Sequence, residues 1–355
     1  PPRSTLFPYT TLFRSVIFTL LIFSESIQNA LVDRRILQNL QGGNQDLLHE
    51  DGLNLVMIGS GGPIANDDRS SPCLAVFTPK TGFLVDAGPG AWKNISRFRL
   101  PADHISFVLL THFHSDHIGD LGEVAMQTWA AGRSLPLRVY GPPGVESVVA
   151  GFRAAYEPDT RYRVLHHGEA TMPEAAGRIK AEAFELKNDA LTTVFDQDGL
   201  KITAFQVDHH PIEPACGYRI EYRGRVVVVS GDTSKNDNVV RYSKQADLLV
   251  HDALAEDRTS RISKKAAELS RSRLVKILND IPSYHATPVQ AAETAREAGV
   301  GMLVLTHLTP PVPNWLDRNR FLKGVDKAWT GKAVLGEDGM IFRLPAGTDQ
   351  IDLVK

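Results

Sequence analysis

The order of apolar and polar positions predicts a chain in which strands and helices alternate. Short apolar runs between turn residues are typical of buried strands, whereas an apolar position every three or four residues is typical of helices. Strand-like runs occupy residues 53–59, 73–78, 82–86, 105–111, 137–141, 201–207, 217–222, 225–230, 247–251 and 302–306. Helical patterns occupy residues 118–131, 145–156, 262–279 and 287–299. We therefore predict an α/β protein, an αββα sandwich in which two mixed β-sheets face each other and helices cover the outside.

The alternating pattern covers only part of the chain. Residues 51–346 carry it and form the predicted main domain, which residues 347–355 follow as a tail. Residues 1–15 match the translation of a sequencing adapter, so we treat them as an artefact. Residues 16–50 form a leader, whose apolar run 16–23 has the length of a signal-peptide core and is too short to span a bilayer. We expect no stable membrane span, and the sequence leaves the location open between export to the periplasm and the cytoplasm.

Possible metal ligands follow directly on the apolar run at 105–111. The segment VLLTHFHSDHIGD contains His112, His114, Asp116 and His117. Residues two apart on an extended segment face the same side, so His112 and His114 can bind one ion, while Asp116 and His117 lie at a turn and can bind a second. Imidazole and carboxylate groups are the ligands that zinc and similar ions accept. A histidine-rich polar loop is the alternative, but four such residues at the end of a strand favour a metal site.

The motif resembles that of the metallo-β-lactamase superfamily, and in particular its ribonuclease Z-like group. The resemblance implies the metallo-β-lactamase fold and three further ligands, each after a later strand, which we assign to His209, Asp232 and His307. His209 is preferred to its neighbour His210 because the pattern D-H-x-P-[VI]-x-P-A of that group aligns it with the ligand. In this assignment Asp232 bridges two metal ions, of which the first is bound by His112, His114 and His209 and the second by Asp116, His117 and His307.

The resemblance also implies a chemistry. It calls for two divalent ions, Zn²⁺ in the first place with Mn²⁺ or Fe²⁺ as alternatives, and a bridging hydroxide that attacks an ester centre. Asp116 holds or deprotonates this nucleophile, and Asp86 supports the ligands by hydrogen bonds. His285, in SYHATPVQAAETAREAGV, matches the group's pattern H-S-[TS]-x-x-Q-A-A and is the predicted proton donor, with a simple helix start as the alternative. Asp252 stands where the group has glutamate, which leaves its ability to orient His285 open.

The sequence restricts the substrate without identifying it. Ribonuclease Z proper carries a long RNA-binding arm between the segments that correspond to residues 217–219 and 231–233, where this chain has only IEYRGRVVVVS, a predicted hairpin. The net charge of −2 and the pI of 6.7 do not provide a broad basic surface for a nucleic acid. We expect a metal-dependent hydrolase for a small or anionic phosphodiester, sulfate ester or related ester. The alternatives are a ribonuclease Z-type endonuclease that processes tRNA 3′ ends, and a lactonase.

Two other classes of protein remain open at this stage. The same fold serves oxidoreductases and thioesterases, but redox use calls for an appended flavin module that the chain does not show. A binding protein with a decayed site has no physical reason to keep all seven ligands. The two cysteines, Cys73 and Cys216, do not decide the compartment, and a homodimer is expected by family analogy alone.

Overall fold

The computed structural model describes residues 24–40 and 43–354, which belong to two units. The first unit, Pro1–Asn44, contributes helix α2 (Glu25–Leu40), on which Leu31 and Leu37 are exposed. The second unit, Gln45–Lys355, contains both sheets. The predictions made for residues 1–15 and for the apolar run 16–23 concern residues outside the described part of the chain.

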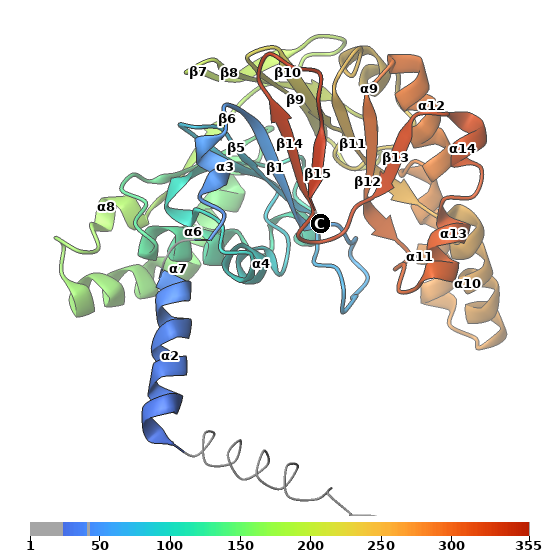
Figure 1. Cartoon of the computed structure of the whole chain (residues 1–355). Helices are drawn as coiled ribbons and strands as arrows, with labels where there is room; N and C mark the ends of the chain where they lie inside the picture. The colour runs from blue at the N-terminus through green and yellow to red at the C-terminus, as the bar shows by residue number, and fades with distance from the viewer. Residues whose placement is uncertain (1–23, 41–42, 355) are drawn as a thin grey trace, which may run out of the picture. The chain divides into compact units, whose positions relative to one another are not determined.

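Two mixed sheets form the second unit (Figure 1). The eight-stranded sheet has the order β15-β14-β1-β2-β3-β4-β5-β6 and the seven-stranded sheet the order β13-β12-β11-β10-β9-β8-β7. The strands of the first sheet are β1 (Gly52–Gly59), β2 (Cys73–Phe77), β3 (Gly82–Val85), β4 (Ile105–Leu109), β5 (Leu137–Gly141), β6 (Ile179–Ala183), β14 (Ile341–Pro345) and β15 (Asp352–Val354). Those of the second are β7 (Thr192–Gln197), β8 (Leu200–Gln206), β9 (Cys216–Tyr222), β10 (Arg225–Val229), β11 (Leu248–Leu254), β12 (Met302–Thr309) and β13 (Lys332–Leu335).

Helices cover the outer face of each sheet. On the chain they are α3 (Asp46–His49), α4 (Ala91–Arg97), α5 (Ser115–Ile118), α6 (Leu121–Ala130), α7 (Val145–His167), α8 (Glu174–Gly177), α9 (Asp237–Tyr242), α10 (Glu256–Glu268), α11 (Ser272–Asp280), α12 (Pro288–Ala298), α13 (Trp315–Phe321) and α14 (Val325–Ala328). Two short 3₁₀ turns, η1 (Ala102–His104) and η2 (Ile281–Ser283), complete the second unit. Among the described helices, none has the length and apolar content that crossing a membrane requires.

Three apolar layers hold the sandwich together. Side chains from both sheets, such as Phe107 and Ile202, form the central layer. A second layer packs α4, α6 and α7 on the first sheet, and a third packs α9, α12 and α14 on the second (Figure 1). The complete burial of β1 and β11 follows from this arrangement, because a strand between two apolar layers has no face left for water. The predicted αββα sandwich is confirmed.

The boundaries of the main domain differ from the predicted 51–346. Leu47 and Leu48 of α3 are buried in the layer outside the first sheet, so the domain begins before residue 51. At the other end, the predicted tail 347–355 contributes β15, which pairs with β14 and extends the first sheet. Both segments are short, and their apolar positions are too few to show a period in the sequence.

Two helical predictions also change. The pattern at 145–156 ended before Pro158, but α7 continues through this proline to His167. An ion pair one helical turn apart, between Asp159 and Arg163 at 2.8 Å, supports the continuation. The pattern at 262–279 is two helices, α10 and α11, since residues 269–271 separate them. Ser270, with a φ of 57°, forms that break.

The direction of the strands determines where a site can form. Strands β3 and β4 run parallel to each other in the first sheet, as do β10, β11 and β12 in the second. Strand β8 shares the direction of β10, because both are antiparallel to β9. The segments that follow the carboxyl ends of such strands meet at one edge of a sheet. All the predicted ligands come from these ends.

Candidate metal centre

The segment after β4 brings the four ligands of the predicted motif together. His112 and His114 lie on the extended part, and the Nε2 atom of His112 is 2.9 Å from the Nδ1 atom of His114. Helix α5 begins directly afterwards and carries Asp116 and His117 in its single turn. The change from extended chain to helix gives Asp116 and His117 a different direction of approach, and the His117 ring still lies beside that of His112, with centroids 4.1 Å apart.

His209 completes a first group of donors with His112 and His114. Its Nε2 atom lies 3.4 Å from the Nδ1 atom of His114, and one ligand atom from each of these three histidines and from Asp232 lies within 4.8 Å of the others. Burial lowers the pKa of all three imidazoles, most strongly that of His112, where the nearby His117 adds to the effect. The three rings are therefore neutral donors at neutral pH.

A second group of donors consists of Asp116, His117 and His307. The Nε2 atom of His307 lies 3.3 Å from a carboxylate oxygen of Asp116, and that of His117 lies 3.7 Å from the same oxygen. Burial opposes protonation of both rings, but neighbouring carboxylates, Asp232 first among them, outweigh it and raise the pKa of His117 and of His307. The second group therefore attracts positive charge more strongly than the first group does.

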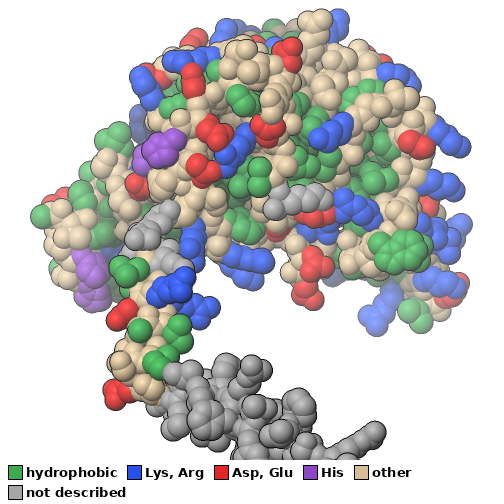
Figure 2. Space-filling model, viewed as in Figure 1, with side chains coloured by type: hydrophobic (Ala, Val, Ile, Leu, Met, Phe, Trp, Pro, Cys, Tyr) green, Lys and Arg blue, Asp and Glu red, His purple; other side chains and the backbone are tan. Residues whose placement is uncertain are grey.

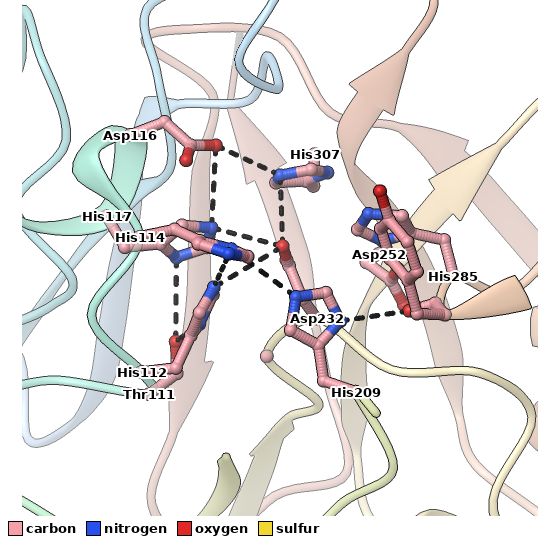
Figure 3. A network of polar contacts seen from close by, with 12 residues as sticks. Thr111, His112, His114, Asp116, His117, His209, Asp232, Asp252, His285 and His307 are labelled. Atoms are coloured by element: carbon pink, nitrogen blue, oxygen red, sulfur yellow. Dashed lines mark hydrogen bonds and ion pairs between the residues drawn. The ribbon is translucent and has the colours of Figure 1, made fainter. Parts of the chain in front are cut away.

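Asp232 lies between the two groups (Figure 3). Its Oδ2 atom is 3.8 Å from the Nε2 atom of His112 in the first group, and 3.3 and 3.2 Å from those of His117 and His307 in the second. Burial opposes the ionisation of Asp232, but His307 and His117 hold the pKa of this carboxyl well below its usual value. Gly231 precedes it with a φ of 65°, and a Cβ atom there would meet the Cys216 carbonyl at 2.7 Å. Glycine thus permits the turn that directs Asp232 into the cluster.

Neighbouring side chains fix the orientation of several donors. Asp86, at the end of β3, accepts a hydrogen bond from the Nδ1 atom of His117 at 2.8 Å and others from Thr111. The hydroxyl of Thr111 is also 3.1 Å from the Nδ1 atom of His112. Asp86 and His307 have φ angles of 60° and 51°. Such left-handed residues cost free energy and are typical of functional sites, where the surrounding structure imposes them.

His285 and Asp252 form a pair beside the cluster. The Nδ1 atom of His285 donates to the Oδ2 atom of Asp252 at 2.8 Å, and the His285 ring stacks on His307 with centroids 5.1 Å apart. Burial opposes the ionisation of Asp252, but hydrogen bonds from His251 and His285 lower its pKa. Aspartate is therefore long enough to orient His285 here, a question that the sequence left open.

The donors suit divalent cations. Ring nitrogens of His112, His114 and His209 and a carboxylate oxygen of Asp232 lie within 4.8 Å of one another, and the buried Nε2 atom of His117 forms no hydrogen bond with any residue that the structure describes. A shared cation satisfies lone pairs that converge in this way, and imidazole with carboxylate is the donor set that zinc and related ions accept. Asp116 and Asp232 are both ionised and offset part of the charge of the ions. The residues present therefore fit a metal centre.

Known proteins with the same features identify the family. The profile of the "Beta-lactamase superfamily domain" matches residues 81–308. The chain belongs to the metallo-β-lactamase superfamily. Within the superfamily the chain is ribonuclease Z-like. It is 34% identical over 290 residues to "Ribonuclease Z" of Mycobacterium bovis (strain BCG / Pasteur 1173P2), and the matched region covers 81% of this chain and 96% of the relative. "Ribonuclease Z" of Mycobacterium avium (strain 104) is 33% identical with the same coverage.

Solved structures agree on the fold. The metallo-beta-lactamase fold protein YhfI from Bacillus subtilis superposes with a TM-score of 0.59 at 21% identity, over 83% of this chain and all of that one. Human tRNase Z, short form, gives a TM-score of 0.57 at 21% identity with the same coverage. At this identity the likeness shows the fold alone. Together, the superfamily and the ribonuclease Z relatives make the protein a metal-dependent hydrolase of ester bonds, as predicted.

The structure brings all the predicted site residues together, and it adds others. His209 is buried in the cluster while the side chain of His210 is 77% exposed, which supports the choice between them. Thr111 and Tyr284 were not predicted, although each precedes a predicted site residue in the sequence. Tyr284 accepts a hydrogen bond from the Nδ1 atom of His209 through its carbonyl at 3.0 Å. A backbone acceptor leaves no signal in the sequence, so only the structure reveals it.

Proposed function

We propose that the protein is a ribonuclease Z-type phosphodiesterase that cleaves RNA near its 3′ end. The observation that carries the proposal is the match to proteins named ribonuclease Z over 96% of the relative's length. The sequence made RNA an unlikely but not an excluded substrate, and this match favours the ribonuclease Z alternative over the small-ester hydrolase. We further propose that the first group and the second group each hold one divalent ion, most simply Zn²⁺, with Asp232 shared between them.

The residues around the groups supply the remaining chemistry. Divalent ions bound there provide Lewis acidity and lower the pKa of a nearby water molecule, which is what hydrolysis of a phosphodiester needs. Asp116, whose carboxyl has a lowered pKa because His307 and His117 outweigh its burial, accepts a proton from the attacking water. His285 donates a proton to the leaving oxygen through its Nε2 atom, because its Nδ1 atom is held by Asp252.

A local basic surface supports RNA as the substrate. Helices α10 and α11 form a hairpin between Asp252 and His285, and residues 256–280 contain seven Lys or Arg against four Asp or Glu. Figure 2 shows Lys and Arg side chains gathered over the region that these helices and α13 occupy in Figure 1. Four cations of the hairpin are exposed and form no ion pair among the described residues: Arg261, Lys264, Arg271 and Arg273. Free cations of this kind bind phosphate groups.

A second candidate is a hydrolase of small esters, such as a sulfate ester or a lactone. Two observations favour it. The β9–β10 hairpin turns at Arg223 and Gly224, so no arm extends between these strands. The net charge of the whole chain, −2, provides no general attraction for the negatively charged backbone of a nucleic acid. The hairpin of α10 and α11 is the structural reason for ranking this candidate second.

The decisive experiment compares substrates on the metal-loaded protein. We would measure cleavage of a precursor tRNA with a 3′ trailer, bis-p-nitrophenyl phosphate, p-nitrophenyl sulfate and a panel of lactones, with metal content determined in parallel. We expect cleavage of the precursor and of the phosphodiester. Turnover of the sulfate or of a lactone, with the precursor left intact, would replace the proposed function by the second candidate.

Adjacent histidines provide a matched pair of variants. His209→Ala removes a donor of the first group, whereas His210→Ala removes a neighbouring exposed imidazole outside the cluster. We expect the first variant to lose bound metal and activity together, and the second to retain both. Equal loss in the two variants would contradict the assignment of the first group.

A further inference from the structure

A pocket of about 450 Å³ opens beside the first group and has no role in the chemistry described so far. His114 and His209 of the first group line it, together with Pro211, Ile212 and Tyr284. We call it the Tyr284 pocket. Its volume lies within the range of about 300–1,000 Å³ that is typical of small-molecule sites. A group bound there is in direct contact with the imidazoles that we assign to the first ion.

The Tyr284 pocket lies on the side from which a proton reaches the leaving group. The ring of His285 has its centroid 5.2 Å from that of His209 and 5.0 Å from that of Tyr284, and both of these rings line the pocket. A separate pocket of about 610 Å³ contacts the cluster through Asp116 and is lined by neither of them. In Figure 3, His209 and His285 lie on the side of the cluster away from Asp116. Of these two pockets, the Tyr284 pocket is therefore the one lined by the ring neighbours of the predicted proton donor His285.

The lining of the Tyr284 pocket suits a flat, uncharged ring. Tyr284 is half-buried and is held edge-on against His209, with ring centroids 5.2 Å apart and an interplanar angle of 88°. Pro211 and Ile212 add apolar surface. The rim has one cation, Lys276, whose Nζ atom is 2.6 Å from a carboxylate oxygen of Asp280, so the rim has no net charge.

We propose that the Tyr284 pocket binds the nucleoside on the leaving-group side of the scissile phosphate, with its base stacked on Tyr284. This rests on the proposed function, because a phosphodiester of RNA has a nucleoside on each side of the phosphate. Stacking on an aromatic ring accepts any base. Because the rim has no net charge, we expect the pocket to bind the base, while the ions of the first and second groups bind the phosphate. The pocket would thus determine how the RNA enters the site.

The first test measures whether the base is recognised. We would titrate the metal-loaded protein with adenosine monophosphate and with ribose 5-phosphate, which lacks the base, and follow the heat of binding. The wild type should bind the nucleotide about 5- to 150-fold more tightly, the range that one stacked base provides. Tyr284→Ala and Tyr284→Leu should bring the ratio of the two dissociation constants close to one, whereas Tyr284→Phe should keep it.

A matched control removes a tyrosine elsewhere. Tyr162 of α7 is 59% exposed and lines neither pocket, so Tyr162→Ala should leave the ratio unchanged. Thermal unfolding of each variant checks that the fold is retained, and Tyr284→Leu preserves bulk in case the alanine variant is unstable. If the leucine variant folds and still prefers the nucleotide as the wild type does, the base is bound elsewhere and the proposal is wrong.

The second test assigns the side of the phosphate. In a short RNA substrate, one base is removed either from the nucleotide whose oxygen leaves or from the nucleotide on the other side. Loss of the leaving-side base should raise the KM of the wild type and have no further effect in Tyr284→Leu. Loss of the other base should affect both proteins equally. The reverse pattern would overturn the assignment, whereas absence of any RNA cleavage would contradict the proposed function and leave the binding ratio as the test of the pocket.

Discussion

The first and second groups of donors are built from similar residues and differ in their affinity for protons. In the first group, burial lowers the pKa of His112, His114 and His209. In the second group, His117 and His307 are also buried, yet their pKa is raised. Burial is therefore not what separates the two groups. The neighbouring carboxylates separate them, because a negative charge close to an imidazole favours its protonated form.

The carboxylates are distributed unequally for a structural reason. Asp116 belongs to the second group itself, and Asp86 lies behind it at 2.8 Å from His117. Among the described residues, the first group forms one ion-pair contact with a carboxylate, between His112 and Asp232 at 3.8 Å. The rear of the first group is formed instead by neutral acceptors, such as the carbonyl of Tyr284 behind His209. The two neighbouring groups both use histidine, but the first group consists of neutral rings and the second group includes the carboxylate of Asp116.

Replacing Asp232 should impair both groups at once, because it is the carboxylate that contacts both of them. We expect Asp232→Ala to lower kcat/KM for bis-p-nitrophenyl phosphate by at least about 1,000-fold, since electrostatic stabilisation by bound ions contributes several kcal/mol. Both ions should be lost or weakened in metal analysis. As a control, Asp198→Ala removes an exposed carboxylate paired with Lys80 and should change neither quantity. Full occupancy in the Asp232 variant would show that the groups bind metal independently.

Replacing His285 should leave both groups intact and still remove activity. We expect His285→Gln to lower kcat on the RNA substrate by about 100- to 10,000-fold, the usual contribution of a proton donor. On bis-p-nitrophenyl phosphate the loss should stay below about tenfold, because p-nitrophenolate leaves without a proton. Asp252→Asn should show the same selectivity with a smaller loss, since Asp252 acts by positioning His285. A uniform loss on both substrates would contradict the role of proton donor.

Replacing Asp86 should weaken metal binding to the second group more than to the first. Its carboxylate holds the Nδ1 atom of His117, so Asp86→Asn should weaken the ion of the second group by about 10- to 100-fold, as is typical when a ligand loses its supporting acceptor. The ion of the first group should be affected less. Competition with a chelator, followed by stepwise metal analysis, measures both affinities. Equal weakening of the two ions would show that Thr111, which contacts Asp86 and His112, transmits the change.

The sequence predicts one half of the site better than the other. His112 to His117 are contiguous, and their spacing alone indicates two faces of one turn. His209 and Asp232 follow two separate strands and His307 lies near the end of a third, β12, so only the resemblance to known proteins connects them with the motif. Strand direction is what makes them meet, and it is visible in the sheet topology and not in the residues.

Other parts of the molecule depend on contacts that have no local pattern. The Tyr284 pocket requires α11 to lie near the loop at Pro211, which the apolar period of either segment does not specify. The strand β15 has only three residues, and its pairing with β14 supplies the order that its sequence lacks. In contrast, the αββα architecture follows from many apolar runs at once, so errors at single boundaries do not change it.

Lowering the pH should weaken metal binding to the second group more than to the first. A lowered pKa means that His112, His114 and His209 have already lost their protons at neutral pH, so metal binding to the first group changes little down to about pH 6.5. His117 and His307, whose pKa is raised, must each release a proton when an ion binds. Below their raised pKa, the affinity of the second group should therefore fall by at least about tenfold per pH unit. Zinc binding to His307→Ala, which keeps the first group, and to His114→Ala, which keeps the second, measures each dependence between pH 8.5 and 6.5. Parallel curves would show that bound metal, and not the unequal carboxylates, sets the protonation of both groups.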